Sequence, residues 1–295
     1  MPVVVTGASG FIGRRAVAAF ARKSPEVRAY IRRPEAASDL RTVGAKVAVG
    51  GIRDLDTLEV VMEGAHTVCH LVGGLDLPDE RAYEEANLGS VRAALEAARR
   101  AGVKRFLFLS YPGASPEASN AYLRLKGLAE DAVLASGLEH VIIRATHTYG
   151  PGSRWLEASL EQARRWPALV VGSGRQVIAP VFVEDLVAVL VAADDRERVM
   201  SGRFGLEGPD RMTADEFSDL LARRKRPKLH VGPRSAARLA RLVGRRVSLT
   251  LLEVLATQSL ADGPDAAAEF GVRRTPLIEG LARSAVPELR PAGPE

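Results

Sequence analysis

The chain of 295 residues has a single cysteine, Cys69, and no apolar run of the about 20 residues that a bilayer-spanning helix needs. One cysteine excludes an internal disulfide and fits a reducing compartment. No basic segment precedes the apolar residues Pro2–Val5, so we expect no signal peptide and a cytoplasmic protein. The apolar share of 46% and the charged share of 26% are those of an ordinary globular protein.

Ligands for a metal ion are also scarce. Cys69 and His70 are neighbours in the predicted strand Thr67–Val72, so their side chains point to opposite faces. The sequence has no second group of ligand residues beside them. We therefore predict a core cysteine and no metal site.

The first two thirds of the sequence alternate short apolar strands with helices. The predicted strands are Val3–Thr6, Val27–Ile31, Lys46–Val49, Thr67–Val72, Arg105–Ser110 and His140–Arg144. The main predicted helices are Phe11–Lys23, Leu55–Met62, Ala82–Ala101 and Ala121–Ser136. This alternation predicts an α/β fold, a doubly wound parallel sheet covered on both faces. Ligands of such sheets bind at the carboxyl ends of the strands, where the strand order reverses.

After Tyr149 the pattern is less regular, and from Gly202 onward we expect mainly helical segments. We predict a first domain over residues 1–200 and a smaller lobe over 201–295 that is interleaved with it. Trp155 and Trp166 are expected to be core residues.

Residues 6–13 read TGASGFIG, with Gly7, Gly10 and Gly13 at three-residue intervals between the first strand and the first helix. Glycine permits a tight turn and lets the backbone approach a phosphate. The N-terminus of the following helix supplies free N–H groups and a positive dipole end. In this position the spacing predicts a dinucleotide-binding loop, rather than a plain turn without ligand.

No carboxylate follows the second strand, where NAD-binding domains usually carry Asp or Glu for the ribose 2′-hydroxyl. The strand ends in Ile31-Arg32-Arg33-Pro34 instead. Two guanidinium groups suit a 2′-phosphate, so NADP(H) is favoured and NAD(H) stays possible. The alternative is a solvated basic loop.

Tyr122 and Lys126 are four residues apart on a predicted helix and therefore share a face. An ammonium group beside a phenol lowers the pKa of the tyrosine from its usual value of about 10. Such a tyrosine can act as a general acid or base near neutral pH.

These motifs resemble those of the extended or atypical short-chain dehydrogenases/reductases, the NAD-dependent epimerase/dehydratase superfamily. The resemblance runs from about residue 2 to 195. It includes His70-Leu-Val-Gly73, Asn87, Phe106-Leu-Phe-Leu-Ser110, Tyr149-Gly-Pro-Gly152 and Val181-Phe-Val-Glu-Asp185. Within the superfamily, Arg32-Arg33-Pro34 and Phe270-Gly-Val272 are similar to the NADPH-binding accessory subunit of respiratory complex I.

The resemblance implies a Rossmann domain, a substrate-side second lobe and a role for each matching residue. Tyr122 would be the catalytic acid/base and Lys126 its partner, which also contacts the nicotinamide ribose. Arg32, helped by Arg33, would hold the 2′-phosphate. The remaining cofactor contacts would come from Gly7, Ser9, Gly10, Phe11 and Ile12 at the pyrophosphate, Gly51 and Ile52 at the adenine, Leu71, Val72 and Gly73 at the ribose, and Ala145 and His147 at the nicotinamide.

The sequence departs from the superfamily pattern at several of these positions. Gly51 stands where many relatives have Asp for the adenine amine, and Ala145 replaces a frequent proline. The catalytic Ser/Thr usually lies just past the fifth strand, where Ser110 is one position early. Polarisation of the substrate carbonyl would then fall to Ser110, Tyr111 or Ser115, or it would be absent.

Residues 223–246 contain no Asp or Glu and ten Arg or Lys: Arg223, Arg224, Lys225, Arg226, Lys228, Arg234, Arg238, Arg241, Arg245 and Arg246. No aromatic side chain interleaves them for base stacking, so we expect no nucleic-acid partner. Our first interpretation is a solvated helical face, and the second is contact with an anionic surface or a protein.

These observations favour an NADP(H)-dependent oxidoreductase that transfers hydride to or from a carbonyl or alcohol of a small-molecule substrate. One alternative is a nucleotide-sugar epimerase or dehydratase with tightly bound NAD. A second alternative is not an enzyme: it is a non-catalytic NADPH-binding sensor or accessory subunit.

Overall fold

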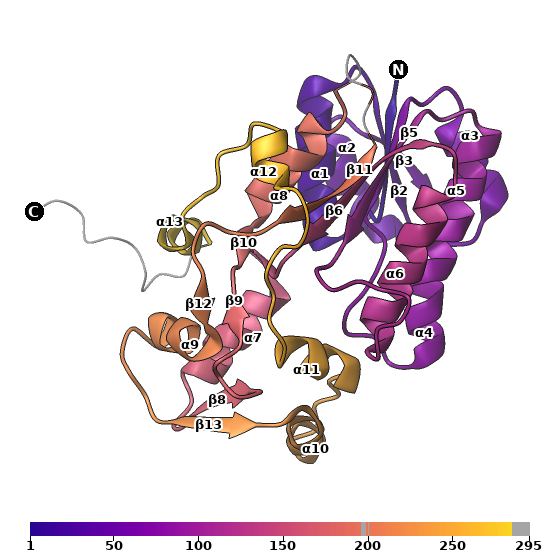
Figure 1. Ribbon diagram of the computed structural model, residues 1–295. Helices are drawn as coiled ribbons and strands as arrows, with labels where there is room; N and C mark the ends of the chain where they lie inside the picture. The colour runs from indigo at the N-terminus through magenta and orange to yellow at the C-terminus, as the bar shows by residue number, and fades with distance from the viewer. Residues whose placement is uncertain (196–198, 200, 285–295) are drawn as a thin grey trace, which may run out of the picture. The chain divides into compact units, whose positions relative to one another are not determined.

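The computed structural model describes residues 1–195, 199 and 201–284 (Figure 1). The chain divides into two compact units and passes between them several times. Unit 1 comprises Met1–Arg144, Val187–Gly205 and Asp262–Val272, and unit 2 comprises Ala145–Leu186, Leu206–Ala261 and Arg273–Glu295. This division differs from the predicted boundary at residue 200, because 145–186 group with unit 2 and 262–272 with unit 1.

A seven-stranded sheet forms the centre of unit 1, in the order β11-β6-β5-β4-β1-β2-β3. The strands are β1 (Val3–Thr6), β2 (Val27–Ile31), β3 (Lys46–Val49), β4 (Thr67–His70), β5 (Arg105–Ser110), β6 (Glu139–Ala145) and β11 (Gly202–Leu206). Neighbouring strands from β1 to β6 pair in parallel. The chain order reverses between β1 and β4, which confirms the predicted doubly wound fold.

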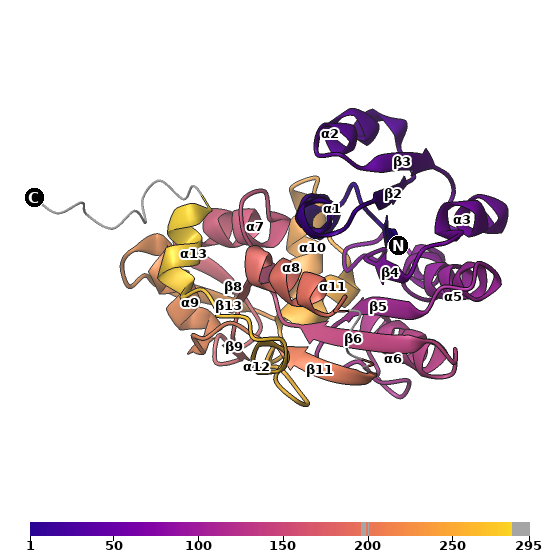
Figure 2. The same cartoon turned by 90° about the horizontal axis from the view of Figure 1, so that it is seen from above.

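Helices cover both faces of this sheet (Figure 2). The helices of this part of the chain are α1 (Phe11–Lys23), α2 (Ala37–Thr42), α3 (Leu55–Met62), α4 (Glu80–Glu84), α5 (Ser90–Arg100), α6 (Ala121–Leu134), α8 (Val183–Ala192) and α12 (Ala266–Glu269). A 3₁₀ turn (Pro34–Ala36) precedes α2. The single helix predicted over Ala82–Ala101 is divided, because a π turn (Glu85–Gly89) separates α4 from α5.

The central strands of the sheet are mostly apolar and buried, whereas β3 at its edge is partly exposed. Every residue of β1 and β4 is buried, including Cys69 at 0% exposure. On α1, Ala16, Val17 and Phe20 recur at helical spacing and are also buried.

The described residues of unit 2 form three two-stranded pairs and five helices, besides the first residues of α8. The pairs are β7 (Thr148–Tyr149) with β10 (Val181–Phe182), β9 (Val177–Ile178) with β12 (Met212–Thr213), and β8 (Ala168–Val171) with β13 (Lys228–Val231). The helices are α7 (Arg154–Ala163), α9 (Ala214–Ala222), α10 (Pro233–Leu242), α11 (Leu249–Leu255) and α13 (Leu277–Arg283). The chain beyond residue 201 is therefore helical as predicted, but it also supplies β11, β12 and β13.

Aromatic and aliphatic side chains form a core cluster of unit 2. Trp155 stacks on Phe217 at 5.1 Å between ring centroids, and Tyr149 packs on Phe182 at 5.5 Å. The prediction that Trp166 is a core residue is wrong. It follows α7 in a turn and is 72% exposed.

Among the residues that the structure describes, we find no helix with the length and apolarity that crossing a membrane requires.

Candidate functional site

The TGASGFIG loop connects β1 to α1 and lies against the end of β4. Gly7 has a φ of +71°, and a Cβ there would come within 2.8 Å of the Leu71 carbonyl group. A Cβ at Gly13 would lie 2.2 Å from the carbonyl oxygen of Gly7. The loop is thus folded so tightly that two of its positions accept only glycine.

The N-terminus of α1 carries no side-chain cap. Gly10 is the N-cap residue, it has no side chain to accept a hydrogen bond, and the first turn contains no acidic residue. By contrast, α3 and α6 are capped by the side chains of Asp54 and Asn120. The uncapped amides and the close glycine turn fit a dinucleotide pyrophosphate.

Arg32 and Arg33 directly follow β2 and are exposed. Neither guanidinium group forms a hydrogen bond or an ion pair with any residue that the structure describes. Because no carboxylate neutralises them, this strand end offers positive charge to an anionic group.

The neighbouring strand end is organised by Tyr30, which sequence reasoning missed. Its hydroxyl donates a 2.7 Å hydrogen bond to the carbonyl oxygen of Gly51, and a Cβ at Gly50 would collide with its ring. Burial and Asp54 raise the pKa of Tyr30 to about 12. Tyr30 therefore fixes the loop of Gly51 and Ile52. The sequence feature that could have indicated this role is a tyrosine near the end of β2 together with the glycine pair Gly50-Gly51 after the neighbouring strand β3.

Beyond β4, the predicted Leu71–Gly73 segment approaches Asn87 and Lys126. A Cβ on Gly73 would lie 3.0 Å from Oδ1 of Asn87 and 3.3 Å from Nζ of Lys126. Asn87 is fully buried in the π turn, accepts a hydrogen bond from the Gly74 amide at 3.1 Å and donates one to the Gly74 carbonyl at 3.0 Å. The sequence analysis gave no role to Asn87. In the structure its side chain fixes the backbone of Gly74, directly after Gly73.

Tyr122 and Lys126 lie on one face of α6 as predicted, 8% and 5% exposed. Nζ of Lys126 donates a 2.8 Å hydrogen bond to the Leu109 carbonyl and lies 5.9 Å from the centroid of the Tyr122 ring. Burial lowers the pKa of Lys126 to about 8, against the opposing effect of Glu130.

The expected lowering of the Tyr122 pKa is contradicted. Burial is the main cause that raises the pKa of this phenol, and the neighbouring Tyr111 and Tyr83 raise it further. The ammonium group lies over the ring, 5.9 Å from its centroid, so its attraction for a phenolate is weaker than the opposing cost of desolvation.

The side chain of Ser110 is bound to Glu130. Its hydroxyl donates a 2.5 Å hydrogen bond to Glu130, a carboxylate that is 1% exposed and also accepts two bonds from Arg144. Tyr111 contacts Tyr122, edge to face, with 5.8 Å between ring centroids. Ser115 bonds to Glu117 in a part of the loop that is partly exposed. Of the three alternatives for the catalytic Ser/Thr position, the structure brings Tyr111 to the tyrosine.

The two remaining predicted residues, Ala145 and His147, belong to unit 2. Both are buried, and His147 stacks on Trp155 with 4.9 Å between ring centroids. Burial lowers the pKa of His147 to about 4, which keeps its imidazole neutral. Their contact with a nicotinamide stays a prediction.

Known proteins are similar to this chain in both sequence and fold. It is 34% identical over 190 residues to a ceramide reductase of Caulobacter vibrioides, covering 64% of this chain and 60% of that protein. It is 31% identical over 225 residues to the mitochondrial NADH dehydrogenase [ubiquinone] 1 alpha subcomplex subunit 9 of Arabidopsis thaliana, covering 74% and 56%. The chain thus spans less than two thirds of the length of these relatives.

A solved structure supports the fold. The UDP-glucuronic acid 4-epimerase of Bacillus cereus, in complex with UDP-glucuronic acid and NAD, has a TM-score of 0.74 and 17% identity, with 96% of this chain and 98% of that chain covered. Residues 7–156, half of the sequence, match the NAD(P)H-binding family. The chain therefore belongs to the NAD(P)H-binding family, and it shares its fold with this epimerase.

Proposed function

We propose that the protein is an NADP(H)-dependent oxidoreductase that reduces a carbonyl group of a small molecule, with Tyr122 as the proton donor. The observation that carries the proposal is the pairing of buried Tyr122 with Lys126, whose ammonium lies beside Gly73 at the end of β4. Parallel sheets of this kind bind their ligands at that edge. A protein that only bound the dinucleotide would have no need for the tyrosine.

The preference for NADP(H) rests on Arg32 and Arg33. Both guanidinium groups are exposed at the end of β2, and no carboxylate of the described residues is paired with them. A ribose 2′-phosphate would complete this site, whereas a 2′-hydroxyl would leave two positive charges without a partner.

The direction of the reaction is inferred from the protonation of Tyr122. When bound, the dinucleotide supplies the hydride. Because burial raises its pKa, the phenol holds its proton at neutral pH and suits donation to a carbonyl oxygen. Lys126 retains its charge below its pKa of about 8 and stabilises the phenolate that donation leaves. The similarity to a ceramide reductase supports a reductase.

The test combines a binding titration with a turnover assay. We expect NADPH to bind at least about tenfold more tightly than NADH, and the Arg32→Gln/Arg33→Gln variant to lose this preference. We expect Tyr122→Phe to bind NADPH like the wild type and to lose about 10²- to 10⁴-fold in carbonyl reduction. Undiminished turnover in Tyr122→Phe would refute the role of the tyrosine.

A second candidate is a non-catalytic NADPH-binding accessory subunit. It is favoured by the similarity to the complex I subunit and by the position of Ser110, whose hydroxyl is bound to Glu130. This candidate predicts the same preference for NADPH, but no turnover of any carbonyl in the wild type. Tight NAD retained through purification would instead support an epimerase or dehydratase.

A further inference from the structure

The helix α10 presents apolar side chains to solvent. Its inner face packs through Ala236 and Ala237 on a cluster that includes Val231 and Leu252. On the outer side, Leu239, Leu242 and Val243 are 44%, 82% and 67% exposed. Leu239 and Leu242 are three residues apart on α10 and lie on neighbouring parts of its surface, and Val243 follows directly as the C-cap residue. Within the described residues of unit 2, these three side chains belong to neither of the two core clusters, and much of their apolar surface is open to solvent.

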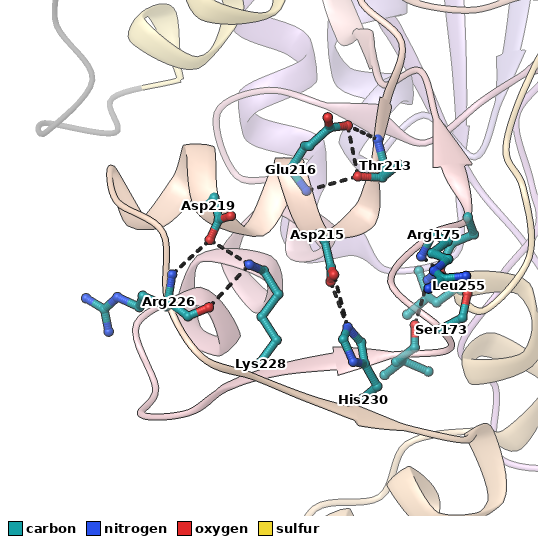
Figure 3. Close-up of polar contacts among 12 residues, drawn as sticks. Ser173, Arg175, Thr213, Asp215, Glu216, Asp219, Arg226, Lys228, His230 and Leu255 are labelled. Atoms are coloured by element: carbon teal, nitrogen blue, oxygen red, sulfur yellow. Dashed lines mark hydrogen bonds and ion pairs between the residues drawn. The ribbon is translucent and has the colours of Figure 1, made fainter.

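Three of the ten basic residues between 223 and 246, Arg226, Lys228 and Arg245, form side-chain hydrogen bonds or ion pairs within unit 2. Asp219 on α9 accepts a 2.8 Å bond from Lys228 and a 3.1 Å bond from the Arg226 amide (Figure 3). The Arg226 guanidinium donates to two backbone carbonyls. Arg245 pairs with Glu161 at 2.8 Å.

The other seven basic residues are exposed, and their side chains form no hydrogen bond or ion pair with the residues that the structure describes. They are Arg223, Arg224, Lys225, Arg234, Arg238, Arg241 and Arg246. Arg234, Arg238 and Arg241 lie on α10 itself. We call Arg234, Arg238, Leu239, Arg241, Leu242, Val243 and Arg246 the α10 surface.

We propose that the α10 surface binds the face of a lipid bilayer that contains anionic lipids. The guanidinium groups would contact lipid phosphates, and Leu242 and Val243 would enter the boundary between headgroups and acyl chains. The arginines of this surface favour a partner with a negatively charged surface. The exposed leucine and valine side chains favour a partner that also has an accessible apolar layer. Nucleic acid offers no such layer, and the stretch has no aromatic residue on which bases could stack.

The proposal does not rest on the proposed oxidoreductase activity. No residue of the α10 surface belongs to the candidate site, and the site residues other than Ala145 and His147 lie in unit 1. An experiment can therefore refute membrane binding without refuting the oxidoreductase activity, and the reverse is also true.

The first test is sedimentation of the full chain with vesicles of phosphatidylcholine, alone or mixed with phosphatidylglycerol. We expect sedimentation with the mixed vesicles only. The Arg238→Gln/Arg241→Gln/Arg246→Gln variant should lose on the order of a hundredfold in apparent affinity, about fivefold for each arginine. A matched control, Arg22→Gln/Lys23→Gln/Arg92→Gln, removes the same charge from exposed positions of unit 1 and should bind like the wild type.

Equal loss in the two triple variants would show that only net charge matters and would overturn the proposal. Failure of the wild type to sediment with the mixed vesicles would also overturn it, leaving an acidic protein surface as the occupant to be sought.

The second test reports the apolar contact. The native Cys69 is fully buried, so Leu242→Cys introduces the one accessible thiol of the chain. An environment-sensitive fluorophore on this thiol should shift to the blue with phosphatidylglycerol vesicles and keep its emission with phosphatidylcholine alone. The same label on Arg92→Cys, an exposed position of unit 1 outside the α10 surface, serves as the control and should keep its emission. An unshifted label at position 242, on vesicles that bind the protein, would contradict insertion of this face.

Discussion

The hydroxyl of Ser110 lies 2.5 Å from Oε1 of Glu130 and is held by a carboxylate that also pairs with Arg144. Ser110 closes β5, directly before the loop that carries Tyr111. The residue expected to polarise a substrate carbonyl is thereby part of a buried ionic network. The same Arg144 donates to the Ala114 carbonyl at 2.9 Å, so the network also fixes the loop beyond Tyr111.

We predict that Ser110→Ala lowers stability but leaves catalysis in place. Loss of a buried hydrogen bond to a charged group should cost about 1.5–3 kcal/mol in the free energy of unfolding, measured by urea denaturation. Under native conditions kcat/KM should stay near that of the wild type. A loss of kcat/KM comparable with that of Tyr122→Phe would return Ser110 to the catalytic site.

A second prediction concerns the glycine loop. Gly13→Ala places a Cβ 2.2 Å from the Gly7 carbonyl oxygen, so the loop has to move away from its present shape. We expect NADPH affinity to fall by at least about tenfold and stability to fall by about 1–3 kcal/mol. Gly232→Ala is the matched control, since a Cβ there meets no atom within 4 Å. Titration of both variants with NADPH should separate them, and equal affinities would contradict the role of the loop.

These features differ in how far the sequence could predict them. The strands from β1 to β6 could be predicted, because they are apolar runs separated by helical segments. The shared face of Tyr122 and Lys126 could also be predicted, because it depends only on their spacing along one helix. Strand β11 was not predicted, because Gly202–Leu206 reads GRFGL and gains its strand structure by pairing with β6, far away in the chain. The pKa of Tyr122 depends on burial beside Tyr111 and Tyr83, which no local pattern reveals. The exposure of Trp166 likewise follows from its position in a turn.

A third prediction follows from the pKa of Lys126, which burial lowers to about 8. If its ammonium stabilises the phenolate of Tyr122, the rate of carbonyl reduction should fall as the pH rises through about 8, because the lysine then loses its charge. Lys126→Arg keeps a cation at all accessible pH values. Its kcat/KM should be lower, but the alkaline limb should move above pH 10. An alkaline limb that stays near pH 8 in Lys126→Arg would assign it to another group.

The fourth prediction concerns stability in mild acid. His70 is 1% exposed, with Thr6 2.9 Å from Nδ1 and Ser90 3.2 Å from Nε2, and burial together with Lys126 lowers its pKa to about 3. Between this pKa and that of an unfolded histidine, about 6.5, the unfolded chain binds a proton that the folded chain does not. Stability is therefore fully present above pH 6.5 and is lost as the pH falls toward 3, with a similar contribution from His147.

Thermal and urea unfolding between pH 7 and pH 5 measure this loss, in a window above the titration of ordinary carboxylates. Each histidine should contribute on the order of 2 kcal/mol by pH 5, since the slope approaches 1.4 kcal/mol per pH unit. His70→Gln replaces the imidazole by a side chain that does not titrate, so the variant should be less stable at pH 7 but should lose less on acidification. A wild-type stability that is constant from pH 7 to pH 5 would mean that the folded chain accepts these protons and that His70 is not held neutral by burial.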